Sequence, residues 1–157
     1  PAFPTRRSSD LLGGLHHDRR DNLKREFAAD HHHGAVSVKD IRFHSMSDHH
    51  LLPVHGRAHV AYLPAGGRLT GVSKIARLVE GFARRPQLQE RLTDQLAQVM
   101  EDILAPQAML VVLEGEHMCM SMRGVRSPGS TTVTTVARGI WASNSAARME
   151  ITALLKG

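Results

Sequence analysis

Two consecutive amphipathic helix patterns, separated by a proline, constrain the fold of this chain more than any other feature. Residues 73–84 carry apolar side chains at helical spacing, and Ser73 is their expected N-cap. Pro86 interrupts this pattern, and a longer one follows over residues 87–104 before Pro106. Each predicted helix has one apolar stripe, so both stripes must be buried against another layer of the fold.

Strand-like segments lie on both sides of the helix pair. Residues 36–43 alternate with one slip, which predicts a β-bulge, and residues 57–64 place Ala58, Val60 and Tyr62 on one face. After the helices we expect extended segments over the ranges 109–113, 118–122 and 131–136, and a short helix over 145–155 capped by Asn144. This order predicts an α+β fold with the helices covering one face of a largely antiparallel sheet.

The first residues differ from the rest of the chain. Residues 1–12 read PAFPTRRSSDLL, which resembles a translated sequencing adapter and has no amphipathic period. Residues 13–25 are strongly polar, and His31, His32 and His33 are typical of a solvated linker. We therefore expect an adapter-like, disordered or truncated segment over 1–26 and one catalytic domain over 27–157, with the N-terminal helices of longer relatives missing.

Composition narrows the class of protein. The chain has 157 residues, one cysteine and a formal net charge of +5, which suits a single domain in a reducing, cytoplasmic compartment. The basic excess fits an anionic ligand such as a nucleotide, and it is equally common in proteins that bind nothing charged. With only 4 Phe, 1 Trp and 1 Tyr, a stacking surface for nucleic acid is not expected. No apolar run approaches the roughly 18 residues of a membrane helix, so we expect no membrane partner.

Four side chains form the only candidate cluster of soft metal ligands. His49 and His50 are adjacent, and His117 and Cys119 form an H-x-C pair that would share one face of a strand. Histidine and cysteine are the usual ligands of zinc. Taken alone, the pattern also fits a chance histidine pair near one buried structural cysteine.

A second group of residues has the chemistry of a nucleotide site. Lys74 and Arg77 share a helix face near an expected N-terminus, where backbone N–H groups also favour anions. A solvated basic face is the alternative. Gln89 and Glu90 fall in the first turn of the next helix, where the carboxylate either opposes the helix dipole or accepts N–H groups from a guanine edge.

Together, the motifs resemble the GTP cyclohydrolase I family from about Phe27 to Leu155. The relevant segments read SMSDHHLLP, GVSKIAR, RRPQLQERLT and EGEHMCMSMRGV, in the family's order and at similar spacing, followed by GSTTVTT. The family carries SMCEHHLLP in the first of these places. The chain is therefore identified as a member of this family on the combination, which is much more specific than any single motif.

The resemblance implies a tunnelling fold (T-fold), in which four antiparallel strands and two long helices per subunit assemble into a barrel. It also implies a homodecamer of two stacked pentamers with active sites between subunits, and Zn²⁺-dependent conversion of GTP to 7,8-dihydroneopterin triphosphate and formate in tetrahydrofolate or another pterin-derived pathway. By position, the implied zinc ligands are His50, Cys119 and the residue at 47. The implied acid/base residues are His49 and His117, with Ser73 near the ribose or phosphates. The implied substrate contacts are Lys74, Arg77, Gln89, Glu90 and Arg123.

The sequence departs from the family's pattern at one of the implied zinc-ligand positions. Ser47 takes the place of the family's first cysteine ligand, and Asp48 replaces the following glutamate. A serine hydroxyl is a poor zinc ligand, and the short Asp48 side chain is a possible oxygen donor. Three interpretations stay open: an enzyme with altered ligation, a paralogue that binds GTP or pterin without normal turnover, or a sequence error at this codon. A nitrile reductase of the same fold is a weaker alternative, because Cys119 lies in the zinc motif.

Overall fold

The computed structural model describes residues 12–15, 23, 26–28 and 34–157. Most of the predicted segment 1–26 and the histidine run 31–33 lie outside these residues. Of the described part, η1 (Gly13–Leu15) contacts the first long helix: the Gly14 N–H donates to the Arg84 carbonyl at 2.9 Å. Leu23 is fully buried in the core. The domain boundary at residue 27 stays a prediction.

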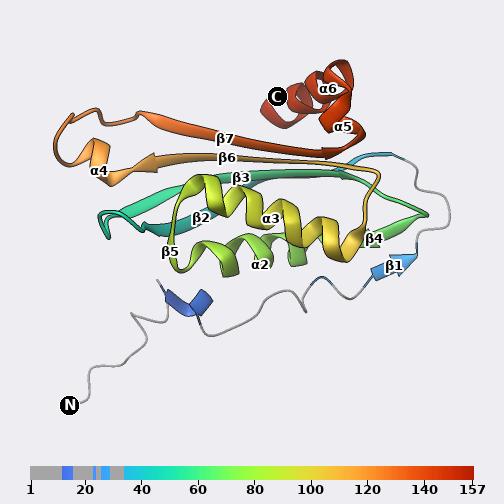
Figure 1. Cartoon of the computed structure of the whole chain (residues 1–157), viewed down its shortest axis with the longest axis horizontal. Helices are drawn as coiled ribbons and strands as arrows, with labels where there is room; N and C mark the ends of the chain where they lie inside the picture. The colour runs from blue at the N-terminus through green and yellow to red at the C-terminus, as the bar shows by residue number, and fades with distance from the viewer. Residues whose placement is uncertain (1–11, 16–22, 24–25, 29–33) are drawn as a thin grey trace, which may run out of the picture.

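A five-stranded sheet forms the centre of the fold, in the order β5-β2-β3-β6-β7 (Figure 1). The long strands β2, β3, β6 and β7 pair antiparallel, and the short β5 joins β2 in parallel. The sheet is therefore mixed, although four antiparallel strands make up most of it. A separate two-stranded sheet pairs β1 with β4. The strands are β1 (Glu26–Ala28), β2 (Val36–Ser47), β3 (Pro53–Leu63), β4 (Arg68–Thr70), β5 (Pro86–Gln87), β6 (Ala108–His117) and β7 (Thr131–Gly139).

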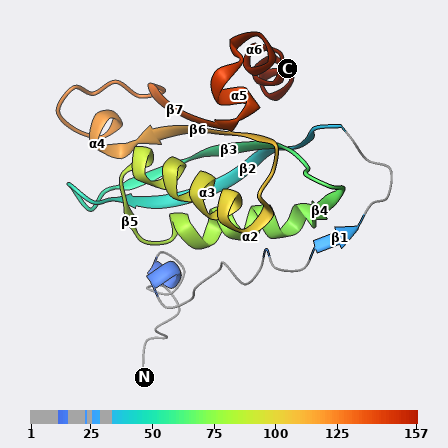
Figure 2. The same cartoon turned by 45° about the vertical axis from the view of Figure 1, so that its right-hand side comes forward.

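The two predicted long helices, α2 (Val72–Ala83) and α3 (Gln89–Leu104), cover one face of the sheet, as Figures 1 and 2 show from two directions. Their stripes pack on β2, β3 and β6 in one large core. The expected bulge is confirmed, because the β2–β3 register shifts between Val38 and Ile41. The expected cap at Ser73 is wrong: α2 begins one residue earlier, with Gly71 as N-cap and no side-chain cap bond.

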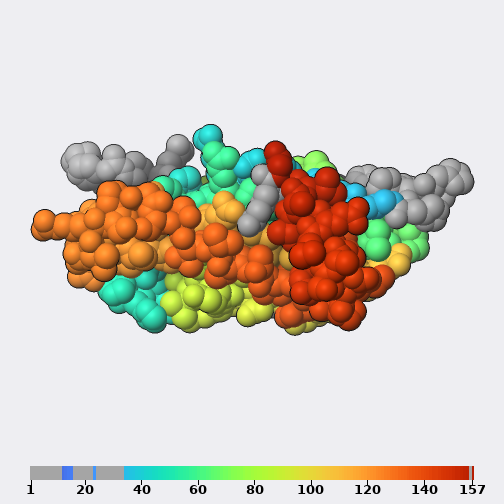
Figure 3. Space-filling view, turned by 90° about the horizontal axis from the view of Figure 1, so that it is seen from above, coloured from blue at the N-terminus to red at the C-terminus, as the bar shows by residue number. Residues whose placement is uncertain are grey.

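The other face of the sheet carries α5 (Ile140–Ser143) and α6 (Ser145–Lys156), seen from above in Figure 3. Asn144 caps α6 as predicted, because its Oδ1 accepts the Ala147 N–H at 3.1 Å. Trp141, Ile151 and Leu155 pack on a second apolar cluster that includes Leu110 and Val112. Residues 109–113 form a continuous apolar run because β6 is covered on both faces.

The segment after β6 differs from its prediction. We expected residues 118–122 to be extended, but β6 ends at His117 and Met118–Ser121 form the one-turn helix α4. Cys119 is therefore not on a strand, and the expectation that it shares a strand face with His117 is wrong. Periodicity could not show this, since a run of methionines around a cysteine fits both conformations.

Among the described residues, no helix combines the length and the apolar character needed to cross a lipid bilayer.

Candidate active site

The candidate site lies at one end of the sheet, where several distant parts of the chain meet. The β2–β3 connection, the end of β6 with α4, and the first turn of α3 lie side by side at this end (Figures 1 and 2). Pairing of Val54 with His117 brings the start of β3 against the end of β6. The predicted residues gathered at this end are Ser47, His49, His50, Gln89, Glu90, His117, Cys119 and Arg123.

A tight backbone turn holds the histidine pair. The Ser47 N–H donates to the Leu52 carbonyl at 2.8 Å, and the Ser47 carbonyl accepts the Leu51 N–H at 2.9 Å. Leu51 takes a left-handed backbone conformation (φ 53°) to close this loop. His49 and His50 are exposed on it, with their ring centroids 6.0 Å apart in an edge-to-face arrangement. The turn thus presents both imidazoles to solvent at the end of the sheet.

His117 is the best-positioned titratable group of the site. Its Nε2 lies 2.9 Å from Oε1 of Gln89, which is only 5% exposed. Burial lowers the pKa of His117 below its ordinary value of 6.5, and the nearby Glu90 carboxylate opposes part of this effect. A neutral imidazole is therefore favoured near pH 7, as a general base requires.

The Gln89 amide is surrounded by partners from two strands, β6 and β7. Its Nε2 lies within hydrogen-bond distance of the Leu113 carbonyl (3.1 Å), the Thr132 carbonyl (2.8 Å) and Thr134 Oγ1 (3.2 Å). Thr93, fully buried one turn further along α3, contacts Thr134 Oγ1 at 2.7 Å. The amide that was predicted to help read guanine is thus engaged within the protein.

Gly115 makes room for this arrangement. A Cβ added at this position would lie 2.5 Å from Oε1 of Gln89, closer than real Cβ contacts allow. The glycine therefore lets α3 approach the sheet closely enough for Gln89 to bridge β6 and β7.

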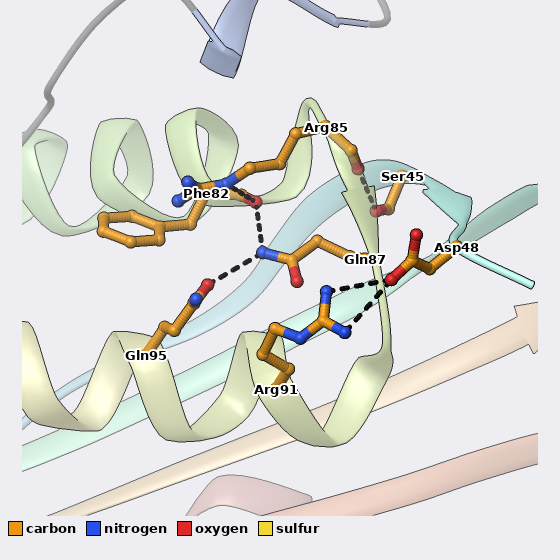
Figure 4. Close-up of polar contacts among 7 residues, drawn as sticks. All are labelled: Ser45, Asp48, Phe82, Arg85, Gln87, Arg91 and Gln95. Atoms are coloured by element: carbon orange, nitrogen blue, oxygen red, sulfur yellow. Dashed lines mark hydrogen bonds and ion pairs between the residues drawn. The ribbon is translucent and has the colours of Figure 1, made fainter.

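Asp48 is held by an arginine from the first turns of α3 (Figure 4). Its Oδ2 accepts from both terminal nitrogens of Arg91, at 3.0 and 3.1 Å, and its backbone N–H donates to the Gln87 carbonyl at 2.9 Å. Both side chains are roughly two-fifths exposed. The carboxylate that we considered as a substitute metal ligand is engaged in an ion pair.

The residues fit a zinc centre only in part. His50 and Cys119 have the right donor chemistry, but no group of three His, Cys, Asp or Glu residues able to hold a metal forms among the described residues. Ser47, 8% exposed at the end of β2, offers a neutral hydroxyl where a third strong donor is needed. The side chains therefore supply two good ligands and one poor one.

A carboxylate on the other face of β6 anchors the segment that follows α4. Glu116 Oε1 accepts from the Ser121 hydroxyl at 2.5 Å and from the Gly129 N–H at 3.1 Å. These bonds, the Ser121 hydroxyl first, lower the pKa of Glu116. The segment carries exposed Arg123, so this anchor restricts where the arginine can reach.

The predicted phosphate contacts on α2 lie away from this cluster. α2 and α3 run in opposite directions, so the first turn of α2 lies beside β4, at the far end from the first turn of α3 (Figure 1). About nine helical residues, or about 14 Å, separate Lys74 from the end of α2 near β5. Arg77 instead lines an open hollow of about 800 Å³ with β2 residues such as Arg42 and His44. One chain does not bring Ser73, Lys74 and Arg77 together with His117.

These features define the class of protein. It is an α+β domain in which a buried amide, Gln89, holds a histidine, His117, at one end of the sheet. A solved structure described as archaeosine synthase QueF-Like, in the apo form, has a similar fold, with a TM-score of 0.55 at 17% identity over 67% of this chain and 93% of that one. The family model for GTP cyclohydrolase I matches residues 4–156. The chain belongs to the GTP cyclohydrolase I family.

Relatives in bacteria support this assignment. A protein named GTP cyclohydrolase 1 from Carboxydothermus hydrogenoformans is 52% identical over 155 residues, covering 99% of this chain and 80% of the relative. One of the same name from Bacillus pumilus is 50% identical over 147 residues, covering 94% and 77%. The match begins at residue 4, within the segment 1–26 that we expected to be adapter-like, disordered or truncated.

Proposed function

We propose that this protein catalyses the GTP cyclohydrolase I reaction, in which GTP and water give formate and 7,8-dihydroneopterin triphosphate. The single observation that carries the proposal is His117, held by Gln89 and adjacent to Glu90, in a chain about half identical to relatives of that name. Water adds to carbon 8 of guanine, the imidazole ring opens, and formate leaves. The ribose carbons then rearrange and a six-membered ring closes.

The side chains of this chain supply binding and proton transfer. His117 and His49 exchange protons with the water and the purine nitrogens. Glu90, exposed in the first turn of α3, accepts N–H groups from the guanine edge. Arg123, Lys74 and Arg77 bind the triphosphate, with Ser73 near the ribose or phosphates.

Zinc would be held by His50 and Cys119, with Ser47 in the third position. When bound, a zinc ion supplies an acidified water near neutral pH. The donor set fits such a centre only in part, because Ser47 offers a neutral hydroxyl. This shortfall favours a second candidate function: a homologue that binds GTP or pterin without normal turnover.

A homo-oligomer completes the site, because Lys74 lies near the far end of the helix layer from His117, and Arg77 lines a separate hollow beside β2. Exposed apolar side chains at the site end support this proposal: Leu51 is 62%, Met122 65% and Val125 77% exposed. Clusters of this kind are typical of protein interfaces. We propose a tunnelling-fold barrel, assembled as a cytoplasmic decamer of two stacked pentamers, with GTP bound between neighbouring subunits.

Purified protein incubated with GTP tests the proposal. We expect equal amounts of formate and of a pterin triphosphate, which becomes fluorescent on oxidation, together with metal that copurifies. GTP binding without formate release would support the binding homologue instead. Absence of both binding and turnover would reject both functions.

A further inference from the structure

From the contacts of the Gln89 amide we infer that Gln89 is a positioning residue, which fixes His117 in the Nε2–H tautomer and leaves the ring's lone pair on Nδ1. The expected effect on catalysis rests on the proposed function, whereas the assignment of the His117 tautomer concerns this chain alone. It assigns Gln89 a role different from the guanine contact that the resemblance implied.

The orientation of the amide follows from its partners. One end of Gln89 faces the carbonyl oxygens of Leu113 and Thr132, which can only accept hydrogen bonds. That end must be the NH₂ group, since the amide oxygen would repel two carbonyls at these distances. The other end, facing His117, is therefore the carbonyl Oε1, which can only accept.

The tautomer of His117 follows in turn. Nε2 lies 2.9 Å from Oε1 of Gln89, so a stable contact requires a hydrogen on Nε2. In the neutral ring Nδ1 then carries the lone pair, and no described residue forms a hydrogen bond with it. The ring is thus held by its Nε2–H on Gln89, and its lone pair is presented at Nδ1.

The surroundings of Gln89 make the opposite orientation of its side-chain amide, with nitrogen and oxygen exchanged, unfavourable. Gln89 is 5% exposed, and Thr93 is fully buried, so water cannot readily replace a lost partner. The Thr93 hydroxyl contacts both the backbone carbonyl oxygen of Gln89 (2.7 Å) and Thr134 Oγ1 (2.7 Å). If Thr93 donates to the carbonyl, Thr134 donates to Thr93 and is free to accept from the Gln89 amide. The hydrogen bonds then form one closed cycle, in which the Gln89 amide donates to Thr134, Thr134 donates to Thr93, and Thr93 donates to the Gln89 backbone carbonyl. This cycle holds Gln89 in place.

Magic-angle-spinning NMR of sedimented protein with ¹⁵N-labelled histidine tests the assignment, because the protonated and unprotonated ring nitrogens differ in chemical shift. Comparison with His117→Asn identifies the His117 signals. In the wild-type protein we expect a protonated Nε2 and an unprotonated Nδ1. A dominant Nδ1–H tautomer would overturn the inference whether or not the protein turns over GTP.

Gln89→Met, which keeps side-chain length but removes the amide, tests the catalytic consequence. We expect mixed tautomers and a kcat about 10- to 100-fold lower, with KM for GTP nearly unchanged. The matched control is Gln98→Met on an exposed turn of α3, where the amide contacts only Asp102; it should leave kcat and the His117 signals as in wild type. A raised KM with unchanged kcat would show that Gln89 reads the substrate and would reject the inference. Should Gln89→Met fail to fold, the wild-type spectrum still decides, and an inactive wild type would reject the proposed function alone.

Discussion

The first turns of α2 and α3 lie at opposite ends of one helical layer, and they are built in different ways. The first turn of α3 has a buried polar residue, Gln89, with partners on β6 and β7. Neither helix has a side-chain cap, but in the first turn of α2 both Val72 and Ser73 are exposed. Polar groups at the start of α3 are therefore preorganised within one chain, whereas Arg77 of α2 lies beside an open hollow at the β2 edge. This difference fits our proposal that one end carries out the chemistry and that the other binds the anionic part of a substrate held by a neighbouring copy.

Mixing two inactive variants tests this division with the largest expected effect. We expect His117→Asn to lower kcat about 1,000-fold and Arg77→Met to weaken GTP binding strongly. If each site combines residues from two copies, co-expressed variants should form some intact sites and recover about a quarter of wild-type activity at equal mixing.

Formate release from the mixed oligomer measures this recovery. The control mixes His117→Asn with Gln89→Met, whose residues come from the same end of one chain. This control should not recover activity, and a lack of recovery with Arg77→Met as well would mean that α2 does not face a neighbour's His117.

The substitution Ser47→Cys sharpens the account of the α3 end. A thiolate in this position would complete a set of three strong zinc ligands. We expect higher zinc content and an activity increase of about 10-fold or more, since zinc affinity depends steeply on its ligands. Metal analysis of purified protein measures the first effect, and GTP turnover at limiting zinc measures the second. Ser45→Cys, two residues earlier on the same strand face, is the control and should change neither.

A smaller effect is expected in the pH profile. Burial places the pKa of His117 below 6.5, so the unfolded chain binds this proton more readily than the folded one. In the folded protein the His117 ring is therefore neutral above pH 6.5, and it becomes protonated as the pH falls through its lower, folded-state pKa. The acid limb of kcat/KM should lie below pH 6.5, and Glu90→Gln, which removes the opposing carboxylate, should move it lower still. An acid limb that moves upward in this variant would contradict the assignment.

The smallest effect concerns the Asp48–Arg91 ion pair. Both side chains are about two-fifths exposed, and exposed pairs contribute at most about 1 kcal/mol. A double-mutant cycle with Asp48→Asn and Arg91→Gln, followed by urea unfolding, should give a coupling free energy in that range. A much larger coupling would mean that the pair holds the histidine turn together.

Much of the fold was predictable because its signals are local. The helix stripes, the bulge near Val38 and the Asn144 cap depend on neighbouring residues, and the structure has all three. The cap at Ser73 and the extended segment over 118–122 were wrong. At Ser73 the helix begins one residue earlier than expected, and over 118–122 the local pattern fits both a helix and an extended segment.

The candidate site was predictable only as a set of residue types. Nothing near Gln89 in the sequence indicates that its amide would contact the backbone at residues 113 and 132, because these contacts span 24 and 43 residues. A glycine at 115 between two glutamates was a weak signal of close approach, and its meaning depends on the helix above it.

The sequence by itself determined the family, the α+β order of elements and the chemical character of the site, because motif identity and hydrophobic period are encoded by neighbouring residues. Only the tertiary structure decided which groups meet. Strand pairing and the antiparallel helices bring Gln89 to His117, carry Lys74 toward the opposite end and leave Arg77 beside β2. Hydrogen-bond satisfaction in a buried space then sets which nitrogen of His117 carries its proton, a property that depends on partners far away in the chain.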